Sequence, residues 1–170
     1  MSRIKSILDM RQSWDDQISD SRVLLEVALE EQAESEAPAI EQSLKSLDAQ
    51  LTKYEITRLL SGEYDDSSAI VSISAGAGGT DAQDWAEMLL RMYTRWCDRR
   101  EYKLEMLDLS PGEEAGLKGA TFRVDGPFAY GYLSCEKGVH RLVRKSPFKS
   151  GNDSRQTSFA AIDVSPMMDD

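Results

Sequence analysis

The spacing of apolar residues changes once along the chain, and this change constrains the fold more than any other feature. In the first half, apolar residues recur at alternating steps of four and three, the spacing of an amphipathic helix that packs on another helix. The row consists of Ile40, Leu44, Leu47, Leu51 and Tyr54. A less regular row from Ile4 to Ile18 precedes it, and Pro38 lies between the two. Because proline interrupts helices, this half predicts an antiparallel helical hairpin.

The second half contains short runs in which apolar and polar residues alternate. Such runs, rich in β-branched side chains, predict strands. They occupy residues 69–74, 102–109, 120–126 and 157–164. Between the first two runs, a helix of about five turns is predicted from one apolar face. That face consists of Ala82, Trp85, Leu89, Met92 and Trp96.

The composition changes at SGEYDDSS, residues 61–68, which has the glycine, aspartate and serine content of a linker. We therefore predict an α+β protein with two domains. Residues 1–66 form a helical domain, a hairpin plus linker. Residues 67–170 form a small mixed sheet packed on one long helix.

The charge is distributed unevenly between these two parts. The chain has 30 acidic and 20 basic residues, a net charge of −10. Residues 1–66 hold 15 acids and 7 bases, a net of −8, which leaves 15 acids and 13 bases, a net of −2, for the rest. This balance argues against indiscriminate binding to nucleic acid or to an anionic membrane. No apolar run is long enough to span a bilayer, so no membrane partner is predicted.

One basic segment stands out in the acidic chain. Between Lys137 and Arg155 there are six Lys or Arg residues and a single acid, Asp153. The segment carries Pro147, Phe148 and several hydroxyl side chains. Bases attract phosphates, hydroxyls bond to base edges, and an aromatic ring can stack on a base, so the segment suits a short single-stranded RNA. A solvated charged face is the alternative interpretation.

A glycine-rich turn separates the first predicted strand from the predicted helix. Gly76, Gly78 and Gly79 precede a helix that is expected to begin near Thr80 and Asp81. Free backbone N–H groups at a helix start can bind phosphate. However, no Gly-Lys-Ser/Thr follows and the third glycine of a dinucleotide site is missing. The spacing therefore favours a structural turn before a capped helix.

The remaining candidate groups do not predict catalysis or metal binding. Glu113 and Glu114 are adjacent acids in a glycine-flanked loop, which are usually solvated. His140 is the only histidine and has no Ser/Asp or Cys constellation near it, so we expect a structural role. Cys97 and Cys135 have neither disulfide nor zinc spacing. We predict no cofactor and no metal.

Several motifs together resemble a known family. They are SAGAGGTDAQDWAEMLLRMYTRW, GEEAGLKGAT, AYGYL, EKGVHRLVRKSPF and RQTSF, in this order. The chain is similar in them to the bacterial and organellar class I peptide chain release factors. Ser-Pro-Phe resembles type 2, which recognises UGA and UAA. The resemblance covers nearly all of residues 69–170, and residues 1–66 resemble the family's N-terminal helical domain, shortened and less distinctive.

The resemblance implies codon-binding roles by position. Ser146, Pro147 and Phe148 match the codon-recognition loop, in which the serine hydroxyl probes the second base. Gly78, Gly79 and Asp81 match the helix start that contacts the first uridine, and Gln156 and Thr157 match the residues that contact the later bases. The basic residues of the segment would contact phosphates. They are Arg141, Arg144, Lys145, Lys149 and Arg155.

Two departures from the family pattern affect what is expected. The family commonly has Glu where Asp81 stands and a stacking His where Gln156 stands; Arg-Gln-Thr-Ser-Phe resembles cyanobacterial and plastid members. The catalytic Gly-Gly-Gln of the family occurs nowhere in the 170 residues. The chain as given is therefore expected not to hydrolyse peptidyl-tRNA and not to act as an enzyme.

Two functions follow from the resemblance. The first is a stop-codon recognition module of a type 2 release factor, with the ribosome and an mRNA stop codon as partners, in bacterial cytoplasm or plastid stroma. The second is an organellar relative without the catalytic domain, which binds and stabilises a specific single-stranded RNA. A purely structural dimer through the acidic hairpin is a weaker third.

The resemblance also implies a route to self-association. In the family a segment from beyond the catalytic domain completes the codon-recognition domain. A chain that ends at Asp170 is thus expected to leave a sheet edge unpaired. Homo-oligomers could form through that edge or through the helical hairpin.

Overall fold

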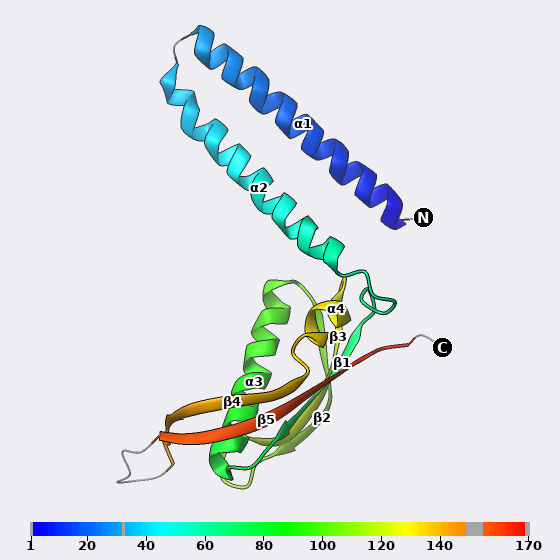
Figure 1. Cartoon of the computed structure of the whole chain (residues 1–170), viewed down its shortest axis with the longest axis vertical. Coiled ribbons are helices and arrows are strands. Elements are labelled where there is room, and N and C mark those ends of the chain that lie inside the picture. The colour runs from blue at the N-terminus through cyan, green and yellow to red at the C-terminus, as the bar shows by residue number, and fades with distance from the viewer. Residues whose placement is uncertain (1, 32, 149–154, 169–170) are drawn as a thin grey trace. The chain divides into compact units, whose positions relative to one another are not determined.

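The computed structural model describes residues 2–31, 33–148 and 155–168. The chain divides into two compact units, Met1–Leu59 and Leu60–Asp170, which are described separately (Figure 1). None of the helices in the described ranges is long and apolar enough to cross a membrane.

The first unit is the predicted antiparallel helical hairpin. It consists of α1 (Ser2–Glu30), a short 3₁₀ turn (Glu34–Glu36) and α2 (Ala37–Leu59). Pro38 lies in the first turn of α2, where its missing N–H costs no helical hydrogen bond. The Trp14 ring meets the Tyr54 ring edge-on, with centroids 5.2 Å apart, and Trp14 Nε1 donates to Gln50 Oε1 at 3.2 Å. Ile40 and Leu47 of α2 are buried in this contact.

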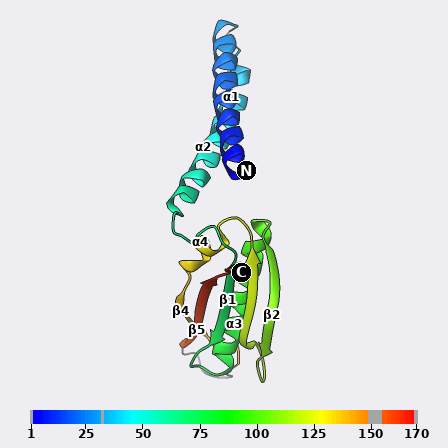
Figure 2. The same cartoon turned by 90° about the vertical axis from the view of Figure 1, so that its right-hand side faces the viewer.

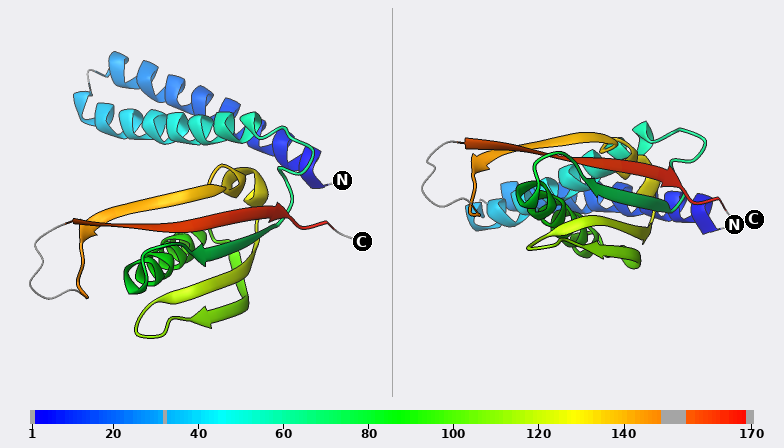
Figure 3. Two further views of the ribbon diagram at one scale, coloured as in Figure 1. Left: turned by 60° about the horizontal axis from the view of Figure 1, so that its bottom comes forward. Right: turned by 90° about the horizontal axis from the view of Figure 1, so that it is seen from below.

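The second unit is a five-stranded sheet with α3 (Thr80–Arg99) packed along one face (Figures 2 and 3). The strand order is β2-β3-β1-β5-β4, and all four pairings are antiparallel. The strands are β1 (Ala69–Ala75), β2 (Lys103–Pro111), β3 (Leu117–Asp125), β4 (Gly138–Lys145) and β5 (Arg155–Pro166). The α+β class is confirmed, and the sheet is antiparallel where a mixed sheet was expected.

The four runs with alternating residues all form strands, but two elements were missed. They are the short helix α4 (Ala129–Ser134) and strand β4. In β4, two basic residues stand on each side of the adjacent Leu142 and Val143, so apolar and polar residues do not alternate along the strand. The sequence of this strand therefore lacks the period-two pattern by which the other strands were predicted. The basic segment is thus a strand as far as Lys145.

The apolar core lies between α3 and the face of the sheet that α3 covers. Alternate residues of the central strands are buried there, because successive side chains of a strand point to opposite faces. From the strands, the core includes Val71, Ile73, Phe122, Val124 and Ile162. From α3, it includes Ala86, Leu89, Tyr93 and Cys97.

The predicted buried face of α3 was partly wrong. Ala82 and Leu89 are buried, whereas Met92 is exposed and both Trp85 and Trp96 are half-buried at the edges of the core. Trp85 reaches an edge because its indole N–H donates to the carbonyl of His140 at 3.0 Å. A fully apolar position would leave that donor without a partner.

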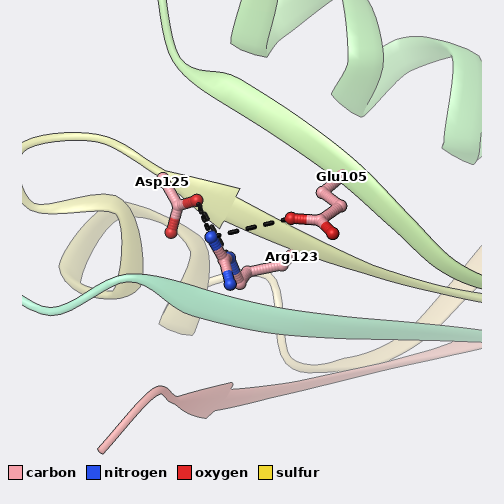
Figure 4. Close-up of polar contacts among 3 residues, drawn as sticks. All are labelled: Glu105, Arg123 and Asp125. Atoms are coloured by element: carbon pink, nitrogen blue, oxygen red, sulfur yellow. Dashed lines mark hydrogen bonds and ion pairs between the residues drawn. The ribbon is translucent and has the colours of Figure 1, made fainter. Parts of the chain in front are cut away.

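The opposite face of the sheet is polar where β2, β3 and β1 meet. Arg123 donates to Asp125 Oδ2 through Nε at 2.9 Å and Nη2 at 2.7 Å, and Nη2 lies 3.6 Å from Glu105 Oε2 (Figure 4). The hydrogen bond with Asp125 raises the pKa of Arg123. Ser72 and Thr121 share a hydrogen bond of 3.1 Å on this face. Where these three strands meet, the antiparallel sheet therefore has one apolar and one polar face.

The linker between the units is bonded to the second unit. The Gly131 amide donates to the Asp65 carbonyl at 3.1 Å, and the Tyr130 amide donates to the Ser67 carbonyl at 3.0 Å. Beyond β5, the Met167 amide donates to the Ser68 carbonyl at 2.8 Å. These bonds explain why the boundary between the two compact units falls after Leu59, so that the linker belongs to the second unit.

Candidate nucleic-acid interface

The glycine turn before α3 packs directly on strand β5. The Gly76 amide donates to the Phe159 carbonyl at 2.8 Å, and a Cβ on Gly76 would lie 2.8 Å from that same oxygen. Gly78 and Gly79 have φ of +137° and +59°, a region that favours glycine. These contacts hold the turn before α3 against Phe159 of β5.

The start of α3 has an acidic setting. Asp81 is 5% exposed, and its Oδ1 has no hydrogen-bond partner among the described residues. Gly79 caps the helix without a side-chain hydrogen bond. Thr80 Oγ1 donates to Glu114 Oε2 at 3.1 Å. Carboxylates around the helix start disfavour a phosphate there.

The loop of Glu113 and Glu114 lies next to the start of α3. The sequence did not predict this contact. The Glu113 amide donates to Gln83 Oε1 at 3.4 Å, and a Cβ on Gly116 would lie 2.2 Å from the Gln83 carbonyl oxygen. Lys118 Nζ donates to Glu113 Oε1 at 2.8 Å, and this hydrogen bond lowers the pKa of Glu113. Glycines on both sides of the two acids were the only signal of this close packing.

Arg144 links the end of β4 to the first turns of α3. Its Nη2 donates to Asp84 Oδ2 in an ion pair, and its Nη1 lies 3.7 Å from Met88 Sδ. Both charged side chains of this pair are largely covered, with 29% and 24% of their surface exposed. Arg144 is thus engaged within the unit, although the sequence had placed it among the phosphate-binding bases.

Ser146, Pro147 and Phe148 follow directly on β4. The Phe148 amide donates to Ser146 Oγ at 3.1 Å, which folds the three residues into a local turn. Ser146 is half-buried, and Pro147 and Phe148 are exposed. The bond uses an oxygen lone pair of Ser146, so the hydroxyl can still donate. Lys149, which was predicted to bind phosphate, lies outside the described residues.

The register of β4 and β5 separates the other predicted residues onto two faces of the sheet. Arg144 pairs with Gln156 on the α3 side. Alternation therefore directs the neighbouring pairs, Lys145 with Arg155 and Val143 with Thr157, to the opposite face. Arg141, Lys145, Arg155 and Thr157 are all exposed there. The predicted basic patch thus has three exposed members on one face, one member in an ion pair and one outside the described residues.

His140 is hydrogen-bonded within the second unit. Its Nε2 lies 2.8 Å from the Glu136 carbonyl oxygen, and its own carbonyl accepts the Trp85 indole N–H. No group of three His, Cys, Asp or Glu side chains in the described part of the chain is placed to hold a metal.

Comparison with known proteins places this geometry in a family. The model of the PCRF domain matches residues 1–162. Peptide chain release factor 2 of Clostridium perfringens is 49% identical over 164 residues, which cover 96% of this chain and 44% of the relative. The chloroplastic peptide chain release factor PrfB1 of Arabidopsis thaliana is 44% identical over 171 residues, covering 99% of this chain and 37% of the relative.

A solved structure agrees in fold as well as in sequence. RF2 of Thermus thermophilus matches with a TM-score of 0.71 and 43% identity, over 99% of this chain and 46% of that one. The chain thus spans less than half the length of the relatives it matches. The chain belongs to the PCRF domain family, among the type 2 peptide chain release factors that its motifs indicated.

Proposed function

We propose that residues 67–170 recognise a stop codon, UGA or UAA, on the ribosome during translation termination. The observation that carries this proposal is the convergence of three segments at one end of the sheet. The glycine turn bonds to β5 through Gly76 and Phe159, and Arg144 ties the strand before Ser146 to α3. Segments that are far apart in the sequence are thereby held as one surface.

The polar groups at this end match the needs of codon recognition. An unpaired uracil offers carbonyl oxygens and one ring N–H on its Watson–Crick edge. Backbone N–H groups at the start of α3 can donate to a carbonyl, and Asp81 Oδ1 is an acceptor without a partner among the described residues. The Ser146 hydroxyl can donate to the second base, and the exposed Phe148 ring can stack on a base.

Peptide hydrolysis lies outside this proposal. The 170 residues contain no Gly-Gly-Gln. We propose that the chain as given recognises the codon without cleaving the peptidyl-tRNA ester. We place it in bacterial cytoplasm or plastid stroma, since bacterial and chloroplastic relatives both match it.

Ribosome binding at fixed salt tests the proposal. The chain is titrated onto ribosomes that carry UGA, UAG or a sense codon in the decoding site. We expect the chain to prefer UGA and Ser146→Ala to remove this preference. Ser165→Ala, at an exposed serine near the end of β5, is the control and is expected to leave the preference intact. Equal binding to all codons, or equal effects of the two substitutions, would refute stop-codon recognition.

A second candidate function is binding to free single-stranded RNA without a ribosome. The observation that favours it is the exposed group of Arg141, Lys145 and Arg155 on the face away from α3. Such a group would contact phosphates without a ribosome. Firm, salt-dependent binding to free single-stranded RNA with no codon preference would support this function and exclude the first.

A further inference from the structure

Strand β4, which leads into Ser146, buries little of its own surface. All eight residues of β4 (Gly138–Lys145) are described, and none of them is buried. β4 also lies at one end of the strand order, where it pairs with β5. Apolar packing therefore contributes less to the position of β4 relative to α3 than it contributes to the central strands, whose alternate residues are buried.

Polar contacts with α3 hold β4 at both of its ends. Near the start of the strand, the Trp85 indole N–H donates to the His140 carbonyl at 3.0 Å. At the other end, Arg144 forms its ion pair with Asp84. Ser146 follows Arg144 by two residues, so the ion pair is the nearer of the two contacts to the serine that is proposed to contact the second base.

The ion pair fixes geometry more than it adds stability. Both side chains are largely covered, and Arg144 Nε is buried without a hydrogen-bond partner among the described residues. Loss of hydration offsets much of the attraction within a covered ion pair, and an unpaired buried N–H disfavours folding further. The guanidinium is planar and rigid, and its Nη1 lies 3.7 Å from Met88 Sδ, so the arrangement holds β4 in one position.

The ion pair joins two segments of the proposed codon surface. Asp84 lies about one turn into α3, which begins at Thr80, and the start of this helix is proposed to contact the first base. Arg144 lies just before the turn at Ser146. We call the start of α3 and the turn at Ser146 the two codon-binding segments. The Asp84–Arg144 pair therefore lies within a few residues of both.

We propose that Asp84 and Arg144 are positioning residues, whose ion pair sets the distance between the two codon-binding segments and makes recognition of the first and second bases interdependent. The inference rests on the stop-codon recognition proposed above. With the distance fixed, a codon that shifts to suit one segment leaves polar groups of the other unpaired, and a wrong base is rejected strongly. Without the ion pair, each segment adjusts separately and codons with one wrong base are tolerated.

A second ion pair of the same unit provides a matched control. Arg123 and Asp125 are 29% and 28% exposed, close to the 29% and 24% of Arg144 and Asp84. The register aligns Arg123 with the end of β5, whereas Arg144 pairs with its beginning. Arg123→Met therefore removes a comparable ion pair from the second unit at a place away from both codon-binding segments.

Ribosome binding at fixed salt measures discrimination at each base. The decoding site carries UGA, CGA or UCA, so that only the first or only the second base differs from UGA. We expect the parent chain to prefer UGA over each of the others at least about tenfold, and Arg144→Met to lower both ratios at least about fivefold. Arg123→Met is expected to leave both within about twofold of the parent.

Conservative changes separate positioning from folding. Arg144→Lys is expected to keep part of both ratios, because an ammonium group still pairs with Asp84 without the fork of the guanidinium. Asp84→Asn keeps the shape of the side chain and removes the charge, so it is expected to lower both ratios as Arg144→Met does. This variant replaces Arg144→Met in the test if the latter loses the circular dichroism of the parent.

Hydrogen exchange in the free chain gives a measurement that needs no ribosome. We expect the peptide that covers residues 141–148 to exchange at least about threefold faster in Arg144→Met and in Asp84→Asn than in the parent. In Arg123→Met this peptide is expected to exchange at the rate of the parent.

The outcomes distinguish the inference from the function on which it rests. A parent chain that binds UGA, CGA and UCA equally would refute stop-codon recognition itself. If the parent discriminates, the positioning role is overturned by a fall in neither ratio or in only one, by equal falls in Arg123→Met, or by unchanged exchange of residues 141–148 in Arg144→Met. In each of these cases the proposed function stands.

Discussion

At the scale of single residues, the face of the strand that a side chain occupies decides its role. Arg141 and Arg144 are two bases of the same strand, three residues apart. Arg144 points to α3 and pairs with Asp84, whereas Arg141 is exposed on the opposite side of the sheet. The sequence presents both as members of one basic segment. Only the register separates a structural ion pair from a surface base.

This difference predicts different effects of the same substitution. Arg144→Met removes one partner of a mostly covered ion pair, so we expect a loss of about 1–2 kcal/mol in the free energy of unfolding. Arg141→Met is expected to change it by less than about 0.5 kcal/mol. Urea denaturation at neutral pH measures both. Equal losses would contradict the assignment of the two faces.

Glycine positions give a second contrast at this scale. Gly116 has φ of +72°, and an added Cβ would lie 2.2 Å from backbone atoms of Gln83. Gly138 has φ of +148°, but its added Cβ would meet nothing within 4 Å. Gly116→Ala therefore combines backbone strain with a clash that no side-chain rotation relieves.

We expect Gly116→Ala to lower the free energy of unfolding by about 3 kcal/mol or more, and Gly138→Ala by about 1 kcal/mol. Thermal denaturation of the two variants beside the parent checks this. A smaller loss for Gly116→Ala than for Gly138→Ala would show that the loop of Glu113 and Glu114 does not pack on α3 as described.

At the scale of elements, α3 organises the second unit through one closely packed face. Small residues such as Ala86 and Cys97 allow the helix to approach the sheet, while the tryptophans lie at the edges of the core. Cys97 is fully buried, and Cys135 is exposed just after α4. Burial, together with the nearby Asp98 charge, raises the pKa of the Cys97 thiol to about 11.

The two thiols are therefore expected to react at different rates. The thiolate is the reactive form, and raising the pKa of Cys97 lowers its thiolate fraction at every pH below about 11. With iodoacetamide at mildly alkaline pH, Cys135 is expected to be alkylated in the folded chain and Cys97 only after urea is added. Peptide mass spectrometry measures both sites. Comparable alkylation of both in the folded chain would contradict the packing of α3.

The hairpin illustrates what an apolar row leaves open. The row from Ile40 to Tyr54 predicted a helix that packs on another helix, and this is confirmed. The spacing of the row predicts that the helix packs on at least one other helix, but it does not predict how many helices pack on it. The exposure of Leu44 and Leu51 could therefore not be predicted from the sequence. That number is a property of the assembled unit.

At the scale of the whole molecule, the two units bury very different amounts of apolar surface. Among the described residues, the hairpin buries the apolar side chains of Ile40 and Leu47, while the second unit has a core whose buried residues come from three strands, β1, β3 and β5, and from two helices, α3 and α4. Since burial of apolar surface is the main stabilising term, the hairpin is expected to be the less stable unit.

We therefore expect two unfolding transitions. In a Trp14→Phe variant, the remaining tryptophans, Trp85 and Trp96, both lie on α3 and report only on the second unit. Helical circular dichroism should begin to fall at a lower urea concentration than the concentration at which tryptophan fluorescence changes. Coincident transitions would show instead that the chain unfolds as one cooperative unit.

Much of the architecture could be predicted from the sequence. Periods of 3.5 and 2 residues identified the hairpin, the long helix and four strands, since these periods arise directly from local backbone geometry. The motifs also indicated the family that the comparisons confirm. The strand β4 was missed because apolar and polar residues do not alternate along it.

The tertiary structure alone decided how the candidate site is assembled. It brought the glycine turn to β5, the acidic loop to the start of α3, and Arg144 to Asp84, all over long separations in sequence. Local periodicity reports which way a side chain points along its own element. Which partner it meets depends on strand order and register, and these follow from how the apolar faces of all elements are buried together.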